Sequence, residues 1–85
     1  MIKFNVNYVY EDRFGRMCIT EQLAEPETYE INSKKDFRKL LPQIRKHKKE
    51  IEGCNKYLFD ILEPEKYVEI SSVEWFEELI EKLSK

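Results

Sequence analysis

The stretch Ile2-Lys3-Phe4-Asn5-Val6-Asn7-Tyr8-Val9-Tyr10 decides the fold class, because apolar side chains recur in it at every second position. Side chains on a β-strand point alternately to its two faces. A period of two therefore predicts a strand with one apolar face and one solvated face. The residues expected on the buried face are Ile2, Phe4, Val6, Tyr8 and Tyr10.

A second strand is predicted directly after this one. Met17, Ile19 and Leu23 repeat the alternation beyond the polar segment 11–15. Gly15 supplies the backbone freedom that a tight turn needs, so the two strands are predicted to form a β-hairpin. Its tip is an aromatic residue between two cations, a composition typical of an interface contact or a base-stacking point. The tip residues are Arg13, Phe14 and Arg16. The alternative is that Phe14 folds back over the edge of the sheet.

The chain also repeats part of its own sequence. Leu23-Ala24-Glu25-Pro26-Glu27-Thr28-Tyr29 aligns with Ile61-Leu62-Glu63-Pro64-Glu65-Lys66-Tyr67, and after the extra Val68 the match continues to Leu41 and Ile80. Each copy has the pattern of a strand, a proline turn, a short strand and a capped helix. We interpret segments 23–41 and 61–80 as a partial internal duplication, with two similar units of separate origin as the alternative.

Two helices are predicted after the short strands. Ser33 is a suitable N-cap, with Asp36 as its capping-box partner, and an apolar stripe then runs toward Gly53, a plausible left-handed C-terminal residue. Pro42 interrupts the stripe without changing its phase, so this segment is one kinked helix or two abutting helices. The last helix begins at Ser71 or Ser72. Its apolar face consists of Val73, Trp75, Phe76, Leu79, Ile80 and Leu83, with Trp75 at the margin.

The resulting element order is β-β-β-α-β-β-α. Tyr57, Phe59 and Ile61 predict the fourth strand, and residues 67–70 predict the fifth. The chain has 85 residues, which suits one domain spanning residues 1–85. We predict an α+β fold, with a mostly antiparallel sheet and two helices on one of its faces.

Composition and motifs argue against an enzyme. The chain has 15 Lys plus Arg against 17 Asp plus Glu, a net charge of −2, so it is neither strongly basic nor strongly acidic. The sequence contains no glycine-rich phosphate loop and no glycine-flanked nucleophilic serine. Cys18, Cys54 and the single His47 lack the paired spacing of a zinc site. We therefore expect no cofactor and no metal.

No apolar run has the length of a membrane span, and the first residues do not resemble a signal peptide. We therefore expect no contact with a membrane, and a cytoplasmic location.

Positive charge is concentrated in the first predicted helix. Residues 34–49 contain eight Lys or Arg against the single Asp36. The cations on one flank could contact nucleic acid or an acidic protein, or they could form a solvated face. They are Lys34, Lys35, Arg38, Lys39, Arg45, Lys46 and Lys49.

Negative charge is concentrated in the second half of the chain. Carboxylates at helical spacing can occupy the surface on which a partner holds phosphates, or they can keep a small protein soluble. The residues are Glu63, Glu65, Glu69, Glu74, Glu77, Glu78 and Glu81.

The absence of catalytic motifs and the separation of charge together favour a binding protein. Our hypothesis is a non-enzymatic protein-binding inhibitor or regulator, such as a phage- or mobile-element-encoded antagonist of a host defence nuclease with an anti-CRISPR-like role. The expected partner is a basic or nucleic-acid-binding protein. The alternative is a small nucleic-acid-binding regulator that uses the basic helix 34–49.

Overall fold

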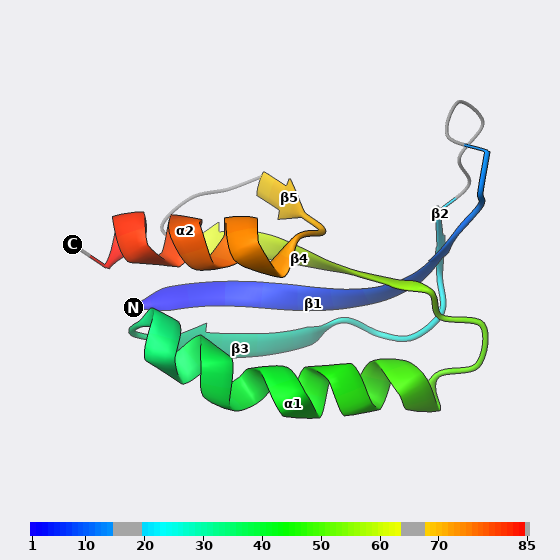
Figure 1. Ribbon diagram of the computed structural model, residues 1–85, viewed down its shortest axis with the longest axis horizontal. Coiled ribbons are helices and arrows are strands. Elements are labelled where there is room, and N and C mark those ends of the chain that lie inside the picture. Colours follow the sequence, from blue (N-terminus) through cyan, green and yellow to red (C-terminus); the bar gives the residue numbers. More distant parts are fainter. Residues whose placement is uncertain (15–19, 64–67, 85) are drawn as a thin grey trace.

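The computed structural model describes residues 1–14, 20–63 and 68–84, and within these ranges seven elements follow the predicted order (Figure 1). The five strands form one antiparallel sheet, which confirms the α+β fold class. The strands are β1 (Ile2–Glu11), β2 (Thr20–Gln22), β3 (Glu27–Ile31), β4 (Lys56–Glu63) and β5 (Val68–Ile70). The helices are α1 (Lys34–Glu50) and α2 (Val73–Leu83).

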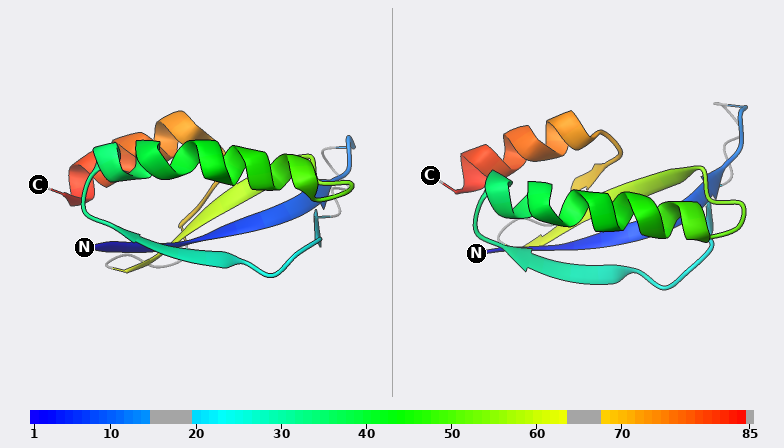
Figure 2. Two further views of the ribbon diagram at one scale, coloured as in Figure 1. Left: turned by 90° about the horizontal axis from the view of Figure 1, so that it is seen from below. Right: turned by 60° about the horizontal axis from the view of Figure 1, so that its bottom comes forward.

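Strand β1 lies at the centre of the described sheet. One of its edges pairs with β4 from Lys3 to Val9. The other edge pairs first with β3, from Ile2 to Val6, and then with β2, from Val9 to Glu11. Strand β5 extends the sheet beyond β4. The apolar alternation of β1 follows from its two faces, because one face of the sheet is covered by the helices and the other is solvated (Figure 2).

Strands β2 and β3 lie in line along β1, which differs from the arrangement implied by the sequence repeat. Between the pairs Val9–Gln22 and Val6–Glu27, β1 contains two residues and the opposite strand contains four, 23–26. Proline has no N–H to donate, so Pro26 cannot continue the ladder. In the second copy, by contrast, β4 and β5 pair with each other. The two copies are therefore structurally alike only from β3 and β5 into the helices.

Both helices cover the same face of the sheet, as predicted (Figure 2). The core between the layers is built around four phenylalanines, one each from β1, α1, β4 and α2, and all are fully buried. The ring centroids of Phe59 and Phe76 lie 4.7 Å apart and stack, while Phe4 and Phe37 both meet Phe76 edge-on at 5.0 Å. This cluster joins both helices to the central pair of strands.

The opposite face of the sheet carries polar side chains that bond to one another across strands. Thr28 donates to the Asn5 side chain at 2.5 Å, and the Asn7 amide donates to the Asp60 carboxylate at 2.8 Å. One predicted core residue is misplaced: Tyr10 is exposed, whereas Val9 is buried. Tyr10 pairs with Glu21 where β1 turns away to meet β2 beyond the end of α1, so no helix covers it (Figure 1).

The helix ends agree with the predicted signals, with one change of partner. The Ser33 hydroxyl caps α1 by accepting from the Asp36 N–H, but the Asp36 carboxylate accepts from Asn32 N–H rather than from the cap residue itself. Helix α1 continues through Pro42 as a single helix. Gly53 follows it with φ +81°, in the left-handed region.

The second N-cap is Ser72, which accepts from the Trp75 N–H. Neither described helix has the length and apolar character required to cross a membrane.

Candidate functional site

The acidic flank of α2 faces the basic flank of α1, and the two helices form ion pairs. Lys34 Nζ lies 2.7 Å from Glu81 Oε1, and Arg38 Nε lies 2.8 Å from Glu77 Oε2. Glu77 is largely covered, with 17% of its side chain exposed. Hydrogen bonding to Glu77 and its negative charge raise the pKa of Arg38. Part of each predicted charged surface is therefore neutralised within the molecule.

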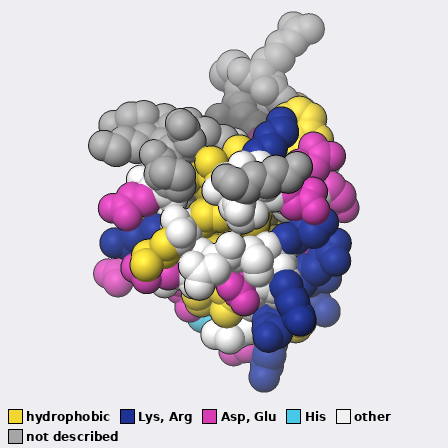
Figure 3. Space-filling model, turned by 90° about the vertical axis from the view of Figure 1, so that its left-hand side faces the viewer, with side chains coloured by type: hydrophobic (Ala, Val, Ile, Leu, Met, Phe, Trp, Pro, Cys, Tyr) yellow, Lys and Arg dark blue, Asp and Glu magenta, His cyan; other side chains and the backbone are white. Residues whose placement is uncertain are grey.

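The remaining cations of α1 lie along its outer side and toward its C-terminal end. Lys35, Lys39, Lys46 and Lys49 are exposed, and no ion pair involves them within the described residues. Figure 3 shows Lys and Arg side chains gathered on one side of the molecule, with acidic side chains nearby. The predicted basic surface thus has two parts. Lys34 and Arg38 face α2 and are paired, whereas Lys35, Lys39, Lys46 and Lys49 are exposed to solvent.

The predicted acidic surface is divided in a similar way. Glu77 and Glu81 are turned to α1, whereas Glu78 and Glu69 line hollows on the opposite flank of α2. Glu74 lies in the first turn of α2. Hydrogen bonds from its own backbone N–H and from the Ser72 hydroxyl lower its pKa, and the charge of Arg45 adds to this effect.

Two acidic residues predicted for this surface lie away from both helices. Glu63 ends β4, opposite Lys3 of β1, and Glu65 lies outside the described residues.

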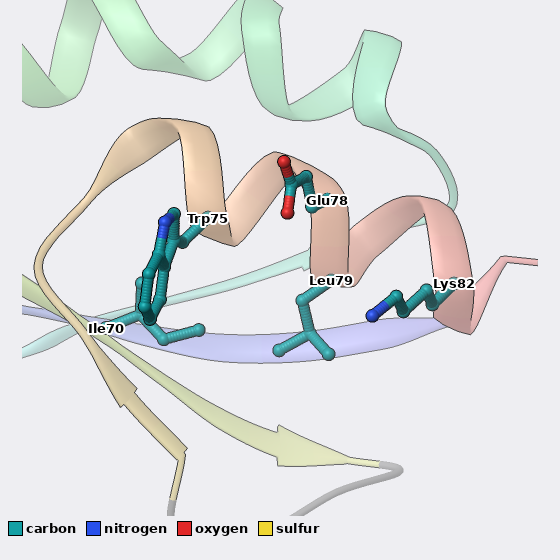
Figure 4. Close-up of a pocket in the computed structure, with 5 residues that line it drawn as sticks. All are labelled: Ile70, Trp75, Glu78, Leu79 and Lys82. Carbon is teal, nitrogen blue, oxygen red and sulfur yellow. The ribbon is translucent and has the colours of Figure 1, made fainter.

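Trp75 forms the most exposed aromatic surface among the described residues, with 70% of the residue exposed. Its ring lies beside Ile70 of β5, and Leu79 projects from the same flank of α2 (Figure 4). A hollow of about 200 Å³ lies between these side chains, Glu78 and Lys82. A second hollow of about 450 Å³ on the other side of the indole is lined by Glu69, Ile70, Ser71, Ser72 and Trp75. We call Ile70, Trp75 and Leu79, with their rim of Glu69, Glu78 and Lys82, the Trp75 surface.

The Trp75 surface also includes the last strand of the described sheet. Strand β5 pairs only with β4 in the part of the chain that the structure describes, so its other edge has no strand beside it. An exposed indole next to an open strand edge offers both an apolar anchor and backbone hydrogen bonds to a partner.

The hairpin tip is a second exposed surface. Phe14 is 59% exposed, and the Arg13 guanidinium lies 5.2 Å from the centroid of its ring. The Asp12 carboxylate accepts from the Phe14 N–H at 2.9 Å and holds the chain at this point. Phe14 therefore does not fold back over the sheet. Arg16, the third predicted tip residue, lies outside the described residues.

A polar cluster that the sequence analysis missed lies at the edge of the core. The hydroxyls of Tyr8 and Tyr29 both donate to Glu27 Oε1, at 2.7 and 3.2 Å. Burial and the neighbouring carboxylate raise the pKa of both phenols. His47 meets the Tyr8 ring edge-on at 4.9 Å. Tyr8 was expected in the core, but its bond to Glu27 depends on strand pairing across 19 residues, which no local pattern reveals.

Residues that could bind a metal do not converge in the described part of the chain, where no three His, Cys, Asp or Glu form a ligand group. Cys54 is a half-buried free thiol whose Sγ lies 3.4 Å from the Lys56 carbonyl oxygen. Cys18 lies outside the described residues. No family model, curated protein or solved structure matches this chain.

Proposed function

We propose that this protein is a non-enzymatic protein-binding inhibitor or regulator, and that it contacts its partner through the Trp75 surface. The observation that carries the proposal is the exposure of Trp75, 70%, beside two hollows and a strand edge with which no other described strand pairs. Tryptophan is enriched among the residues that dominate binding energy at protein interfaces. Exposing so large an apolar ring to water has no benefit for folding.

The charges around the indole indicate the chemistry of the partner. Glu69 and Glu78 line the two hollows, and Lys82 is the single cation that lines them within the described residues. A predominantly acidic rim around an apolar centre favours a partner with a basic rim and an apolar cavity. A nucleic-acid-binding protein has such a rim. A host defence nuclease in the cytoplasm is therefore our proposed target, with the protein acting as a phage- or mobile-element-encoded antagonist.

The alternative, a nucleic-acid-binding regulator that uses residues 34–49, has less support. Lys34 and Arg38 are engaged by Glu81 and Glu77. The two carboxylates lie 2.7 and 2.8 Å from these cations, well within the Debye length of about 8 Å. Their negative charges therefore repel a polyanion that approaches this half of the helix.

The proposal is tested by affinity capture from a lysate of host cells, followed by mass spectrometry. We expect a basic protein that is captured by the unmodified chain and lost with Trp75→Ala. Tyr10→Ala is the matched control, because it also removes an exposed aromatic ring, 43% exposed, but from β1 rather than from α2. Thermal unfolding of each variant verifies that it is folded.

Two further variants sharpen this experiment. Glu69→Lys with Glu78→Lys should weaken capture of the same protein, because these substitutions reverse the rim charge. Phe14→Ala examines the hairpin tip. Capture that survives Trp75→Ala and is abolished by Phe14→Ala would contradict our assignment and place the contact at the tip.

A further inference from the structure

A third hollow, with a different chemical character, lies at the C-terminal end of α1. Its volume is about 340 Å³. The side chains that line it are Arg45, Lys48, Lys49, Cys54 and Tyr57. None of these described lining residues is acidic, whereas the cations at the other end of α1 face carboxylates of α2. Three cations around one open hollow produce a local positive potential.

The helical spacing explains why these cations converge. Arg45, Lys48 and Lys49 occupy positions i, i+3 and i+4, which share one flank of a helix. The Lys48 ammonium lies 5.1 Å from the centroid of the Tyr57 ring. Tyr57 belongs to β4, so this contact joins the end of α1 to the sheet. Like charges at this spacing repel one another, so the arrangement is unfavourable unless an opposite charge compensates it.

The helix dipole supplies part of that compensation. Cations in the last turn of a helix interact favourably with its negative end, and Lys48 and Lys49 lie in that turn. The dipole accounts for cations anywhere around the last turn. It does not account for their gathering over one hollow together with a tyrosine.

We propose that this hollow binds a phosphate group attached to a planar ring, as in a nucleoside monophosphate. The guanidinium of Arg45 can donate two parallel hydrogen bonds to phosphate oxygens, and the two lysines add point charges. The Tyr57 hydroxyl can donate to the ligand. Its half-buried ring already has Lys48 over it and the ring centroid of Phe59 at 5.1 Å, so a base can contact only the part of the ring that these neighbours leave exposed. This site lies apart from the Trp75 surface, and its test does not depend on a protein partner.

One negative charge that acts on this hollow belongs to Glu74. Its interaction with Arg45 contributes to the lowered pKa of its carboxyl, so the two side chains share an electrostatic field. Glu74 thus contributes negative charge on the side of the hollow that Arg45 lines. A compact ligand with one phosphate therefore fits this place better than a duplex, whose further phosphates would approach the acidic residues of α2.

The test is an NMR titration of the ¹⁵N-labelled protein with adenosine monophosphate at low salt. We expect saturable shifts confined to the amides of the lining residues, with a dissociation constant of about 1 mM or lower, a free energy of about −4 kcal/mol. Adenosine, which has the ring without the charge, should bind at least about tenfold more weakly. Absence of saturable shifts at about 10 mM adenosine monophosphate would overturn the proposal.

A pair of charge-matched variants separates this site from general attraction to a basic helix. Arg45→Gln with Lys49→Gln should weaken binding by about tenfold or more, because it removes two charged hydrogen-bond donors. Lys39→Gln with Lys46→Gln removes the same charge from the outer side of the helix and should change binding by less than about twofold. Equal losses in the two pairs would refute a specific site.

Glu74→Gln should have the opposite effect and tighten binding, because it removes a negative charge whose field acts on Arg45. Weaker binding by this variant, in a protein that remains folded, would contradict the placement of the phosphate beside Arg45.

A 5′-phosphorylated oligothymidylate of about six nucleotides distinguishes the two possible sources of the phosphate, a free mononucleotide and a single-stranded nucleic acid. For a single strand, the log of the binding constant falls with the log of salt concentration at about −0.7 per phosphate contacted. A slope of that size for the oligonucleotide identifies a site for one phosphate. A steeper slope and tighter binding for the oligonucleotide would identify single-stranded nucleic acid as the source of the same group.

Discussion

The Tyr8 hydroxyl is a buried phenol whose state of ionisation affects stability. It is fully covered, and it donates to Glu27 at 2.7 Å. Burial, followed by the bond to Glu27, raises its pKa in the folded protein above the usual value of 10.0. The folded state therefore retains this proton at a pH where the unfolded chain has lost it. Stability from this group is fully present below about pH 10 and decreases as the pH rises further.

Tyr8→Phe should reveal this linkage. At about pH 8 the variant should be less stable by about 1–3 kcal/mol, because it loses a hydrogen bond to a carboxylate. Above about pH 10 the difference should shrink by about 1.4 kcal/mol per pH unit, because only the unmodified chain loses the contribution of Tyr8. Urea unfolding of both proteins across this range measures the difference. A constant difference would show that the Tyr8 pKa is not raised.

Gly53 illustrates a residue whose role follows directly from the sequence. Its φ of +81° is costly for any residue with a Cβ, and the added Cβ would meet only Leu23 Cδ1, at 3.9 Å. Gly53→Ala should therefore lower stability by about 1–2 kcal/mol through backbone strain alone. Denaturant unfolding measures this loss. An unchanged midpoint would mean that the turn after α1 readjusts without cost.

At the scale of elements, α1 and α2 are held together by apolar contacts and by ion pairs between their facing flanks. The Arg38 side chain remains 61% exposed, so water and salt screen its pair with Glu77. A double-mutant cycle with Arg38→Ala and Glu77→Ala should give a coupling energy of about 0.3–1 kcal/mol, typical of exposed pairs. The coupling should fall when about 0.5 M salt is added. A coupling that does not depend on salt would contradict this origin.

Local sequence patterns predicted most elements but not how the strands meet. The period of two in β1, the serine caps and the stripe of α1 each depend on residues close in sequence, and the structure confirms all three except for Tyr10 at the end of the strand pattern. The in-line arrangement of β2 and β3 depends on which edge of β1 accepts them. This arrangement is determined by pairing between residues that are distant in sequence. The repeat around Pro26 and Pro64 suggested instead that β2 and β3 would be arranged like β4 and β5, which pair with each other.

The candidate surfaces were only partly predictable for the same reason. Sequence placed Trp75 at the margin of its apolar face and marked Phe14 as a turn residue, and both are exposed. The sequence did not establish that Glu77 and Glu81 would face α1, because this depends on how the two helices pack. Similarly, the hollow at Tyr57 combines residues from α1, β4 and the connection between them.

At the scale of the whole molecule, the four-phenylalanine cluster is the feature on which all layers depend. Each ring comes from a different element and meets the other three, so truncating any one of them weakens the contacts of its element with all the others. A chain of 85 residues has few other buried side chains that could compensate.

Two adjacent residues of α2 allow this division between core and surface to be tested. Phe76 is fully buried and Trp75 is 70% exposed, so both carry a large ring but only one packs in the core. Phe76→Ala should lower the free energy of unfolding by about 3–5 kcal/mol, through lost burial and the cavity left behind. Trp75→Ala should change it by less than about 1 kcal/mol, while abolishing partner capture. Calorimetric or urea unfolding of the two variants decides the matter, because a large loss with Trp75→Ala would show that the indole serves the fold and not a partner.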